Sequence, residues 1–195
     1  MVWNQRVWMV VGLGNPGRSY ALSRHNAGFM VIQRLFRRWG FSPWQKRFLS
    51  RMSHGQRGED TVYLLLPETF MNRSGEAILV AQKSLQCPLE RLLVVYDDLD
   101  LPLGSIRVRP EGGPGTHRGM QSIVEALGSE AFPRVRVGIG PLPAGADAAA
   151  FVLESFTAEE KTRLEPALEA ACQAVEMTLN GAIDRAMNAF NRKQT

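Results

Sequence analysis

The chain has 195 residues, 45% hydrophobic and 22% charged, which is typical of a soluble globular protein rather than a disordered or fibrous one. No apolar run approaches the roughly 18 residues of a membrane span. The two cysteines, Cys87 and Cys172, have no second thiol or histidine at the spacing of a structural zinc site. We therefore expect a single domain over residues 1–195 in the reducing cytoplasm, with no membrane association.

The charge is distributed unevenly along the chain. The formal net charge is +4, yet residues 1–58 contain ten Lys or Arg and no Asp or Glu. This asymmetry indicates a polyanionic partner, nucleic acid or a membrane surface. The alternative is that the basic side chains only solvate one helix.

Apolar runs rich in Val, Ile and Leu alternate with stretches of helical periodicity. The expected strands are 7–13, 61–66, 92–96, 105–109 and 135–139, and the expected helices are 24–39, 75–85, 118–127 and 158 to about 193. Thr157 and Glu160 predict a capping box at the start of the last helix, and Pro166 is expected to divide that helix in two. The alternation predicts an α/β fold: a single domain with a twisted mixed β-sheet flanked by helices on both faces.

A glycine loop follows the first expected strand, with the sequence GLGNPG over residues 12–17. The spacing matches the dinucleotide fingerprint, but Pro16 removes an amide at the helix entry. The acidic residue that would bind a ribose is also missing, since the first acid in the chain is Glu59. Asn15 is the other candidate residue in this loop. On a tight turn its side chain could offer both a donor and an acceptor to a ligand. The alternative is that asparagine stands here because Asn-Pro is common in turns.

His25 begins the next helix beside this loop, and three carboxylates, including Asp97, crowd the carboxyl end of the strand at 92–96. An imidazole that donates one N–H to Asp97 would keep its other nitrogen free to accept a proton. No histidine or carboxylate spacing favours a metal site. Neither a nucleophilic-serine motif nor a plausible cysteine nucleophile is present, so attack by activated water is the simplest chemistry.

The other two histidines give weaker signals. His54 lies in a polar stretch and is expected in a solvated loop, whereas His117, in a glycine-rich loop, is either structural or a ligand contact.

Arginines alternate with apolar residues on two expected strands. Arg107 and Arg109 share one face of the first strand, and Arg134 and Arg136 repeat the pattern on the second. Guanidinium groups bind phosphate oxygens in a forked, bidentate geometry, so these arginines could form a phosphate clamp. The alternative is that they lie on a solvated face of the sheet and pair with nearby acids.

Four segments resemble the bacterial-type peptidyl-tRNA hydrolases, in the right order and with similar spacing. They are residues 12–28 (GLGNPGRSYALSRHNAG), 67–75 (PETFMNRSG), 96–104 (YDDLDLPLG) and 132–140 (FPRVRVGIG). The resemblance implies a monomeric domain without metal or organic cofactor, which hydrolyses the ester between peptide and tRNA.

The resemblance also implies roles for individual residues. His25 would be the catalytic base, Asp97 would stabilise its imidazole, and Asn15 would lie beside the scissile ester. The family's cleft for the peptide and the tRNA 3′ end corresponds to Tyr20, Phe70, Met71 and Asn72, and its clamp for the tRNA 5′ phosphate to Arg109 and Arg136. The basic N-terminal segment and the C-terminal helix become candidate surfaces for the acceptor stem.

One position departs from the family pattern, which usually has asparagine where this chain has Arg118. An arginine accepts no hydrogen bond, and its charge near His25 would disfavour the imidazolium. Alternatively, Arg118 turns outward as a substrate contact and binds a phosphate. It also keeps open a second function, a non-catalytic RNA-binding protein related to an organellar splicing factor.

Overall fold

The computed structural model of the protein describes residues 6–191. The strands are β1 (Val7–Gly12), β2 (Gln45–Arg47), β3 (Ser50–Arg57), β4 (Asp60–Pro67), β5 (Leu92–Pro102), β6 (Ile106–Arg109) and β7 (Arg134–Gly140). The α-helices are α1 (Ala27–Trp39), α2 (Ser74–Leu85), α3 (Arg118–Leu127), α4 (Ala148–Phe151), α5 (Ala158–Leu179) and α6 (Ile183–Phe190). Short 3-10 helices are η1 (Arg18–Tyr20), η2 (Arg24–Asn26), η3 (Met71–Arg73) and η4 (Leu89–Arg91).

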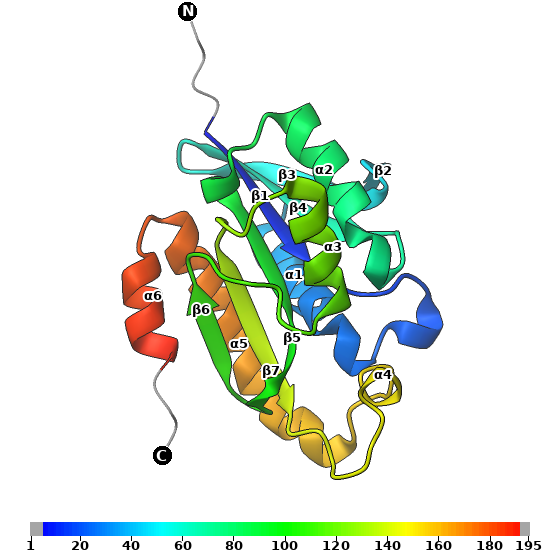
Figure 1. The fold of residues 1–195 in the computed structure, drawn as a ribbon. Coiled ribbons are helices and arrows are strands. Elements are labelled where there is room, and N and C mark those ends of the chain that lie inside the picture. Colours follow the sequence, from blue (N-terminus) through cyan, green and yellow to red (C-terminus); the bar gives the residue numbers. More distant parts are fainter. Residues whose placement is uncertain (1–5, 192–195) are drawn as a thin grey trace, which may run out of the picture.

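The strands form one sheet in the order β2-β3-β4-β1-β5-β7-β6 (Figure 1). The four central strands run parallel, and β3, β2 and β6 are antiparallel to their neighbours. The carboxyl ends of β4, β1, β5 and β7 therefore meet at one end of the sheet, where ligands bind in open α/β folds. The expected α/β class with a mixed sheet is confirmed.

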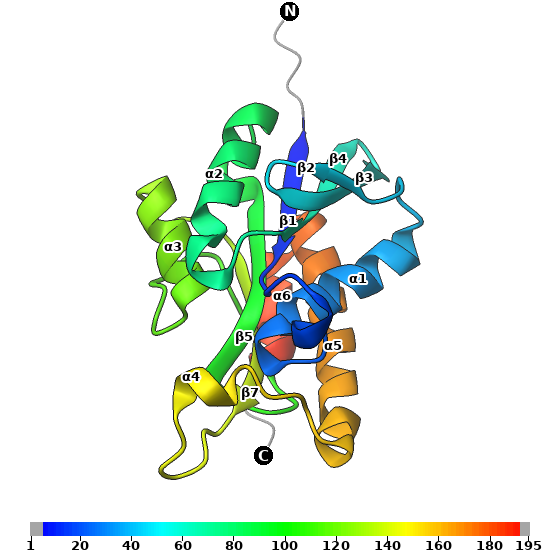
Figure 2. The ribbon, with the colours of Figure 1, turned by 90° about the vertical axis from the view of Figure 1, so that its right-hand side faces the viewer.

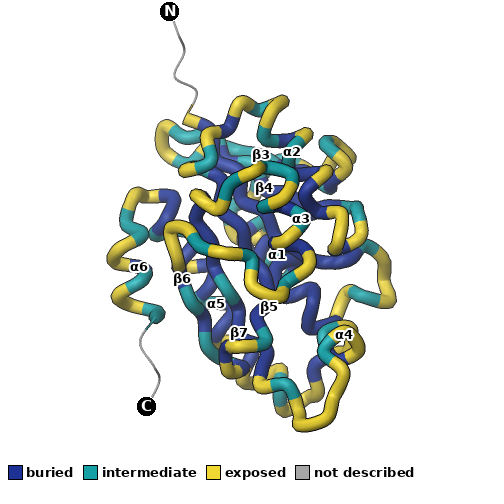
Figure 3. The backbone as a smooth tube through the Cα atoms, in the orientation of Figure 1, coloured by how far each residue is buried: buried dark blue, intermediate teal, exposed yellow. Residues whose placement is uncertain are grey.

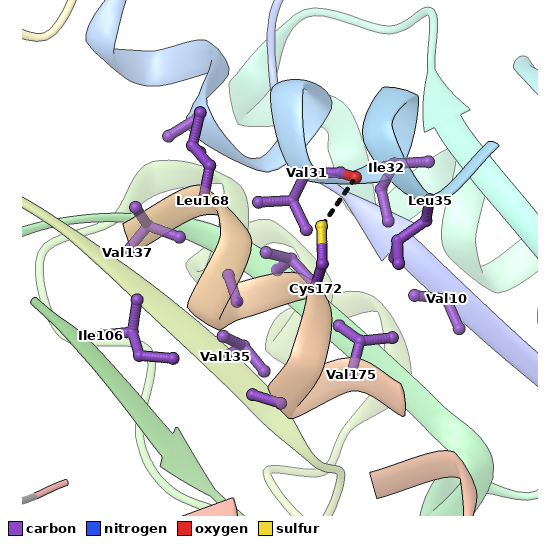
Figure 4. Close-up of a cluster of buried hydrophobic side chains, with 14 of the residues drawn as sticks. Val10, Val31, Ile32, Leu35, Ile106, Val135, Val137, Leu168, Cys172 and Val175 are labelled. Atoms are coloured by element: carbon purple, nitrogen blue, oxygen red, sulfur yellow. Dashed lines mark hydrogen bonds between the residues drawn. The ribbon is translucent and has the colours of Figure 1, made fainter. Parts of the chain in front are cut away.

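Helices cover both faces of the sheet, with α2 and α3 on one side and α1 and α5 on the other (Figure 2). Near-continuous apolar strands such as β1, which is buried throughout, suit this double cover. On the α1 and α5 side, Val10 and Val135 of the sheet pack against Ile32, Leu168 and Cys172 (Figure 4). No described helix is both long enough and apolar enough to span a bilayer.

The basic residues of the first 58 positions are largely neutralised within the fold. On the paired faces of α1 and α5, Arg34 binds Glu165 and Arg38 binds Glu169 at 2.6 Å. Seven of the ten basic residues form ion pairs: Arg6, Arg24, Arg34, Arg38, Lys46, Arg51 and Arg57. The inference of a polyanionic partner from this segment is therefore weakened, because most of the charge faces acidic side chains.

Three expectations about the elements are wrong. Residues 45–57 form a hairpin that the periodicity did not indicate, because the residues it buries include Ser50 and Ser53. His54 lies in β3 rather than in a loop, stacked on Tyr63 at 5.4 Å between ring centroids. The acidic cluster lies inside β5, since Asp97 still pairs with Val137 before the register shifts between Asp98 and Pro102.

The last helical segment breaks at a different point from the one expected. The predicted capping box at Thr157 and Glu160 is present, and α5 then runs through Pro166 without interruption. Its buried stripe, which includes Leu164 and Leu168, holds the helix against the sheet on either side of the proline. The break comes at Gly181, whose φ of 74° ends α5 before α6. The expected end near Lys193 lies outside the described residues.

Candidate active site

A cavity of about 690 Å³ opens at the carboxyl ends of the parallel strands. Loops after β1 and β4, the end of β5, the start of α3 and the short helix α4 surround it, and the segment around α4 is largely exposed (Figure 3). The polar side chains that line it are Asn15, His25, Asn72, Asp97, Asp98, Asp100, Thr116, His117, Arg118, Arg136 and Asp147. Most of the predicted site residues therefore meet at one place.

His25 and Asp97, 72 positions apart, are directly hydrogen-bonded. His25 Nδ1 lies 2.9 Å from both carboxylate oxygens, and Asp97 is only 2% exposed. Burial by itself would raise the pKa of Asp97, but His25 and His117 more than offset this and hold it well below its usual range. A carboxylate that stays ionised requires a proton on His25 Nδ1, which leaves Nε2 as the basic nitrogen.

His117 bonds to the same carboxylate. Its Nε2 lies 3.0 Å from Asp97 Oδ1, and its Nδ1 accepts the backbone N–H of Met120 at 3.2 Å as the N-cap of α3. The second bond fixes the neutral tautomer, with the proton on Nε2 facing Asp97. Sequence reasoning left His117 undecided, and the available signal was its place directly before an expected helix start.

His25, Asp97 and His117 also form the kind of cluster that can bind a metal ion, with ligand atoms within 4.8 Å of one another. Sequence spacing could not reveal this group, because three separate elements supply it. The nitrogens that face Asp97 carry protons in the hydrogen-bond pattern above, and a protonated nitrogen has no lone pair for a metal. The donor set therefore fits a hydrogen-bonded network better than a metal centre.

Asn15 is held in place by its neighbours, and its side-chain N–H groups have no hydrogen-bond partner among the described residues. The Asn26 side chain bonds both the N–H and the C=O of Asn15, at 2.8 and 3.0 Å. Asn15 Oδ1 accepts the N–H of Met71 at 2.9 Å. This bond uses one of the two lone pairs of Asn15 Oδ1 and fixes the orientation of the amide.

The glycine loop serves packing between β1 and α1 rather than phosphate binding. A Cβ on Gly12 would lie 2.4 Å from the carbonyl oxygen of Gly28, and one on Gly28 would lie 2.3 Å from that of Val95. Only glycine permits this backbone contact. The close approach brings His25, two residues before α1, to the ends of β1 and β5.

The expected cleft residues separate into two groups. Phe70, Met71 and Asn72 line the cavity, with Phe70 59% exposed and Met71 buried against Gly119. Tyr20, expected among them, lies in η1 and is not one of the described residues that line the cavity. Its carbonyl instead accepts the Ser23 hydroxyl in the turn before His25.

The four arginines on β6 and β7 do share one face of the sheet, but their roles differ. Arg107 pairs in register with Arg136, and Arg109 with Arg134. Arg134 is buried and donates to the carbonyls of Gly112 and Glu130, so it cannot belong to a phosphate clamp. Burial lowers the pKa of Arg134.

Arg136 and Arg109 are accessible to a ligand. Arg136 lines the cavity and is bound by Asp98, which is itself fixed by the N–H of Asp100 at 2.8 Å. Arg109 is exposed on the edge strand, outside the cavity. Arg118 is the first residue of α3, exposed at the cavity wall, and forms no ion pair with a described residue.

A further contact, not foreseen from the sequence, ties His25 to the far wall of the cavity. The backbone N–H of His25 donates to Val152 just after α4, at 2.8 Å. The neighbouring Arg24 is buried, bonds Glu160 through two 2.8 Å contacts and stacks on Phe151 at 4.3 Å. The cavity wall around α4 and the His25 turn therefore form one connected unit.

Comparisons with known proteins identify relatives of the whole chain. Residues 9–195 match the family model described as peptidyl-tRNA hydrolase. A peptidyl-tRNA hydrolase of Carboxydothermus hydrogenoformans is 46% identical, over 95% of this chain and 99% of its own length. One from a Synechococcus strain is 47% identical, over 94% of this chain and 82% of its own. The crystal structure of peptidyl-tRNA hydrolase from Acinetobacter baumannii superposes with a TM-score of 0.88 at 34% identity, covering 94% of each chain.

Proposed function

The chain belongs to the peptidyl-tRNA hydrolase family, and we propose that it hydrolyses peptidyl-tRNA to peptide and free tRNA. In this proposal His25 assists the attack of water on the ester. The observation that carries the mechanism is the His25–Asp97 pair at 2.9 Å in the wall of the cavity. The pair leaves one basic imidazole nitrogen for a water molecule.

In the proposed reaction, water attacks the carbonyl carbon of the ester while His25 Nε2 removes a proton from that water. The C–O bond to the ribose then breaks, and His25 returns the proton to the ribose oxygen. Asp97 stabilises the imidazolium between these steps, and His117 orients the carboxylate from its other side. A base positioned in this way contributes about 10² to 10⁴ in rate.

The remaining residues bind the two parts of the substrate. Asn15 donates its amide N–H to a carbonyl oxygen of the peptide, which suits a substrate whose amino group is blocked. Phe70, Met71 and Asn72 contact the peptide and the tRNA 3′ end. Arg118 binds a phosphate near that end, and Arg136 with Arg109 binds the 5′ phosphate.

We further propose that the enzyme acts in the cytoplasm as a monomer, without a metal or an organic cofactor. The protonated nitrogens facing Asp97 support metal independence.

The first experiment measures release of N-acetyl-amino acid from N-acetyl-aminoacyl-tRNA by the native chain and by His25→Ala, each with and without EDTA. We expect cleavage by the native chain that EDTA leaves unchanged. We expect His25→Ala to lose at least about 100-fold in kcat while its tRNA affinity stays within twofold.

Two results would contradict the proposal. Tight tRNA binding without cleavage by the native chain would favour a non-catalytic RNA-binding protein and identify Arg118 as the disabling change. Loss of activity in EDTA with recovery on adding metal would contradict metal independence.

A further inference from the structure

The last described residue of the chain makes a contact that the proposed mechanism does not use. Asn191 follows α6, and its side chain bonds both backbone groups of Val108 in β6. The amide oxygen accepts the Val108 N–H at 2.7 Å, and the amide nitrogen donates to the Val108 C=O at 2.9 Å. The side chain thus supplies the donor and the acceptor that a neighbouring strand would offer to this residue.

β6 needs such a partner because it lies at the edge of the sheet. It pairs with β7 on one side, and Val108 turns its N–H and C=O to the free edge, where α6 packs beside it (Figure 1). Val108 is fully buried, so water cannot readily replace the Asn191 amide. The two bonds are therefore a fixed part of the sheet edge.

The charges on β6 oppose its pairing with β7. Arg107 lies opposite Arg136 in the register, and Arg109 lies opposite Arg134. Like charges directly opposite each other destabilise a strand pair. Pro110, which has no N–H to donate, follows at once and cannot extend the pairing. The end of β6 that carries Arg109 therefore depends on a further contact, which the amide at the free edge provides.

Asn191 is itself held in place by α6. Its backbone N–H donates to the C=O of Met187 at 3.0 Å, which makes it the C-cap of the helix. The helix in turn packs on the core through Ile183, Ala186 and Met187. The amide therefore reaches β6 from a helix of fixed position.

We propose that Asn191 is a positioning residue for tRNA binding: it fixes Val108 and so holds the neighbouring Arg109 where it binds the 5′ phosphate together with Arg136. This inference rests on the proposed function, and in particular on its phosphate clamp. Asn191 touches neither the substrate nor the reacting atoms. Its removal should therefore weaken binding of the tRNA 5′ end and leave the chemical step unchanged.

The test compares two forms of N-acetyl-aminoacyl-tRNA, one with a 5′ phosphate and one with a 5′ hydroxyl. They differ only in the group that the clamp would bind. The variant is Asn191→Ala, which removes both bonds to Val108. The matched control is Asn188→Ala, because Asn188 lies in the last turn of the same helix, is exposed and forms no side-chain hydrogen bond with a described residue.

We expect the native chain to have the lower KM for the 5′-phosphate substrate. Asn191→Ala should raise that KM about fivefold, because two neutral hydrogen bonds that restrain the end of β6 are lost. KM for the 5′-hydroxyl substrate, and kcat for both, should stay within about twofold. Asn188→Ala should change none of these values.

A double-mutant cycle with Arg109→Ala separates positioning from general stability. In a chain that already carries Arg109→Ala, Asn191→Ala should change KM for the 5′-phosphate substrate less than about twofold, because the side chain that it positions is gone. A purely structural role would have the same effect in both backgrounds.

Three results would overturn the inference alone: an unchanged 5′-phosphate preference in Asn191→Ala, equal rises in KM on both substrates, or an undiminished effect in the Arg109→Ala background. A native chain that cleaves both substrates with equal KM would contradict the phosphate clamp, and the inference would fail with it. Cleavage of neither substrate by the native chain would contradict the proposed hydrolysis itself.

Discussion

At the scale of single residues, Asp97 controls the candidate site. It lies inside β5 with 2% exposure, and both of its hydrogen-bonded partners are imidazoles. A buried carboxylate without partners would favour its protonated form, so the two histidines keep it ionised. In return, Asp97 fixes which nitrogen of His25 carries the proton. The chemistry of His25 therefore depends on a residue that the substrate need not touch.

Asp97→Asn tests this dependence. The amide cannot stabilise an imidazolium and can donate to His25 Nδ1, which selects the wrong tautomer, so we expect kcat to fall about 10²- to 10⁴-fold. A native-like kcat in the variant would exclude this role of Asp97.

The ionised carboxylate should also make the stability of the protein depend on pH. Because the folded-state pKa of Asp97 lies below 3.8, its stabilising contribution is present above about pH 4 and lost as the pH falls further. Urea unfolding of the native chain and of Asp97→Asn at pH 3 and pH 7 checks this dependence.

At the scale of elements, the antiparallel pair β6 and β7 presents the arginines that we propose as the phosphate clamp. Its register places four arginines on one face of the sheet. We propose only Arg136 and Arg109 as the phosphate clamp. Arg134 instead donates to backbone carbonyls and supports the loop from 110 to 117. Arg134 thereby holds the segment that leads to His117. One strand, β7, thus supplies both a residue of the cavity wall, Arg136, and the support of the loop that leads to His117.

Arg136→Ala and Arg109→Ala should each weaken tRNA binding and reduce the slope of log K against log salt by about one. Lys83→Ala, an exposed lysine on α2 without an ion pair among the described residues, is the control and should change the slope little. Cleavage of a minimal ester that lacks the tRNA body should be unaffected. Equal losses on the minimal ester and on full-length substrate would remove the clamp from the mechanism.

At the scale of the whole molecule, the sheet separates two cores, and each contains one cysteine. Cys172 packs beneath α1 and α5, and Cys87 packs on the α2 side. Burial raises the pKa of Cys87 to about 12 and that of Cys172 to about 11, so neither is a thiolate at neutral pH. Both thiols are therefore inert reporters of packing rather than reactive groups.

Alkylation with iodoacetamide at pH 8 should leave both thiols of the native chain unmodified over an hour and label both in guanidinium chloride. With increasing denaturant, the thiol that reacts first reports which face of the sheet opens first. Rapid labelling of either cysteine in the native state would show that its core is open under native conditions. Mass spectrometry of the tryptic peptides distinguishes the two sites.

The amino-acid sequence alone was enough to predict the features that depend on local pattern. Apolar runs predicted five strands, the spacing of Thr157 and Glu160 predicted a helix start, and the missing ribose-binding acid excluded a dinucleotide site. His25, Asn15 and Asp97 could be chosen because strand ends in such sheets converge. The hairpin at 45–57 gave no such pattern, because buried serines replace the apolar residues that periodicity detects.

The partners of each side chain became known from the folded structure alone. It paired four of the ten basic N-terminal residues with glutamates of α5, committed Arg134 to backbone carbonyls, and paired the side-chain oxygen of Asn15 with the N–H of Met71. It also brought His117 to Asp97. The His117–Asp97 and Arg24–Glu160 contacts, for example, join residues 20 and 136 positions apart. Their formation depends on how whole elements pack, a property that no local pattern in the chain contains.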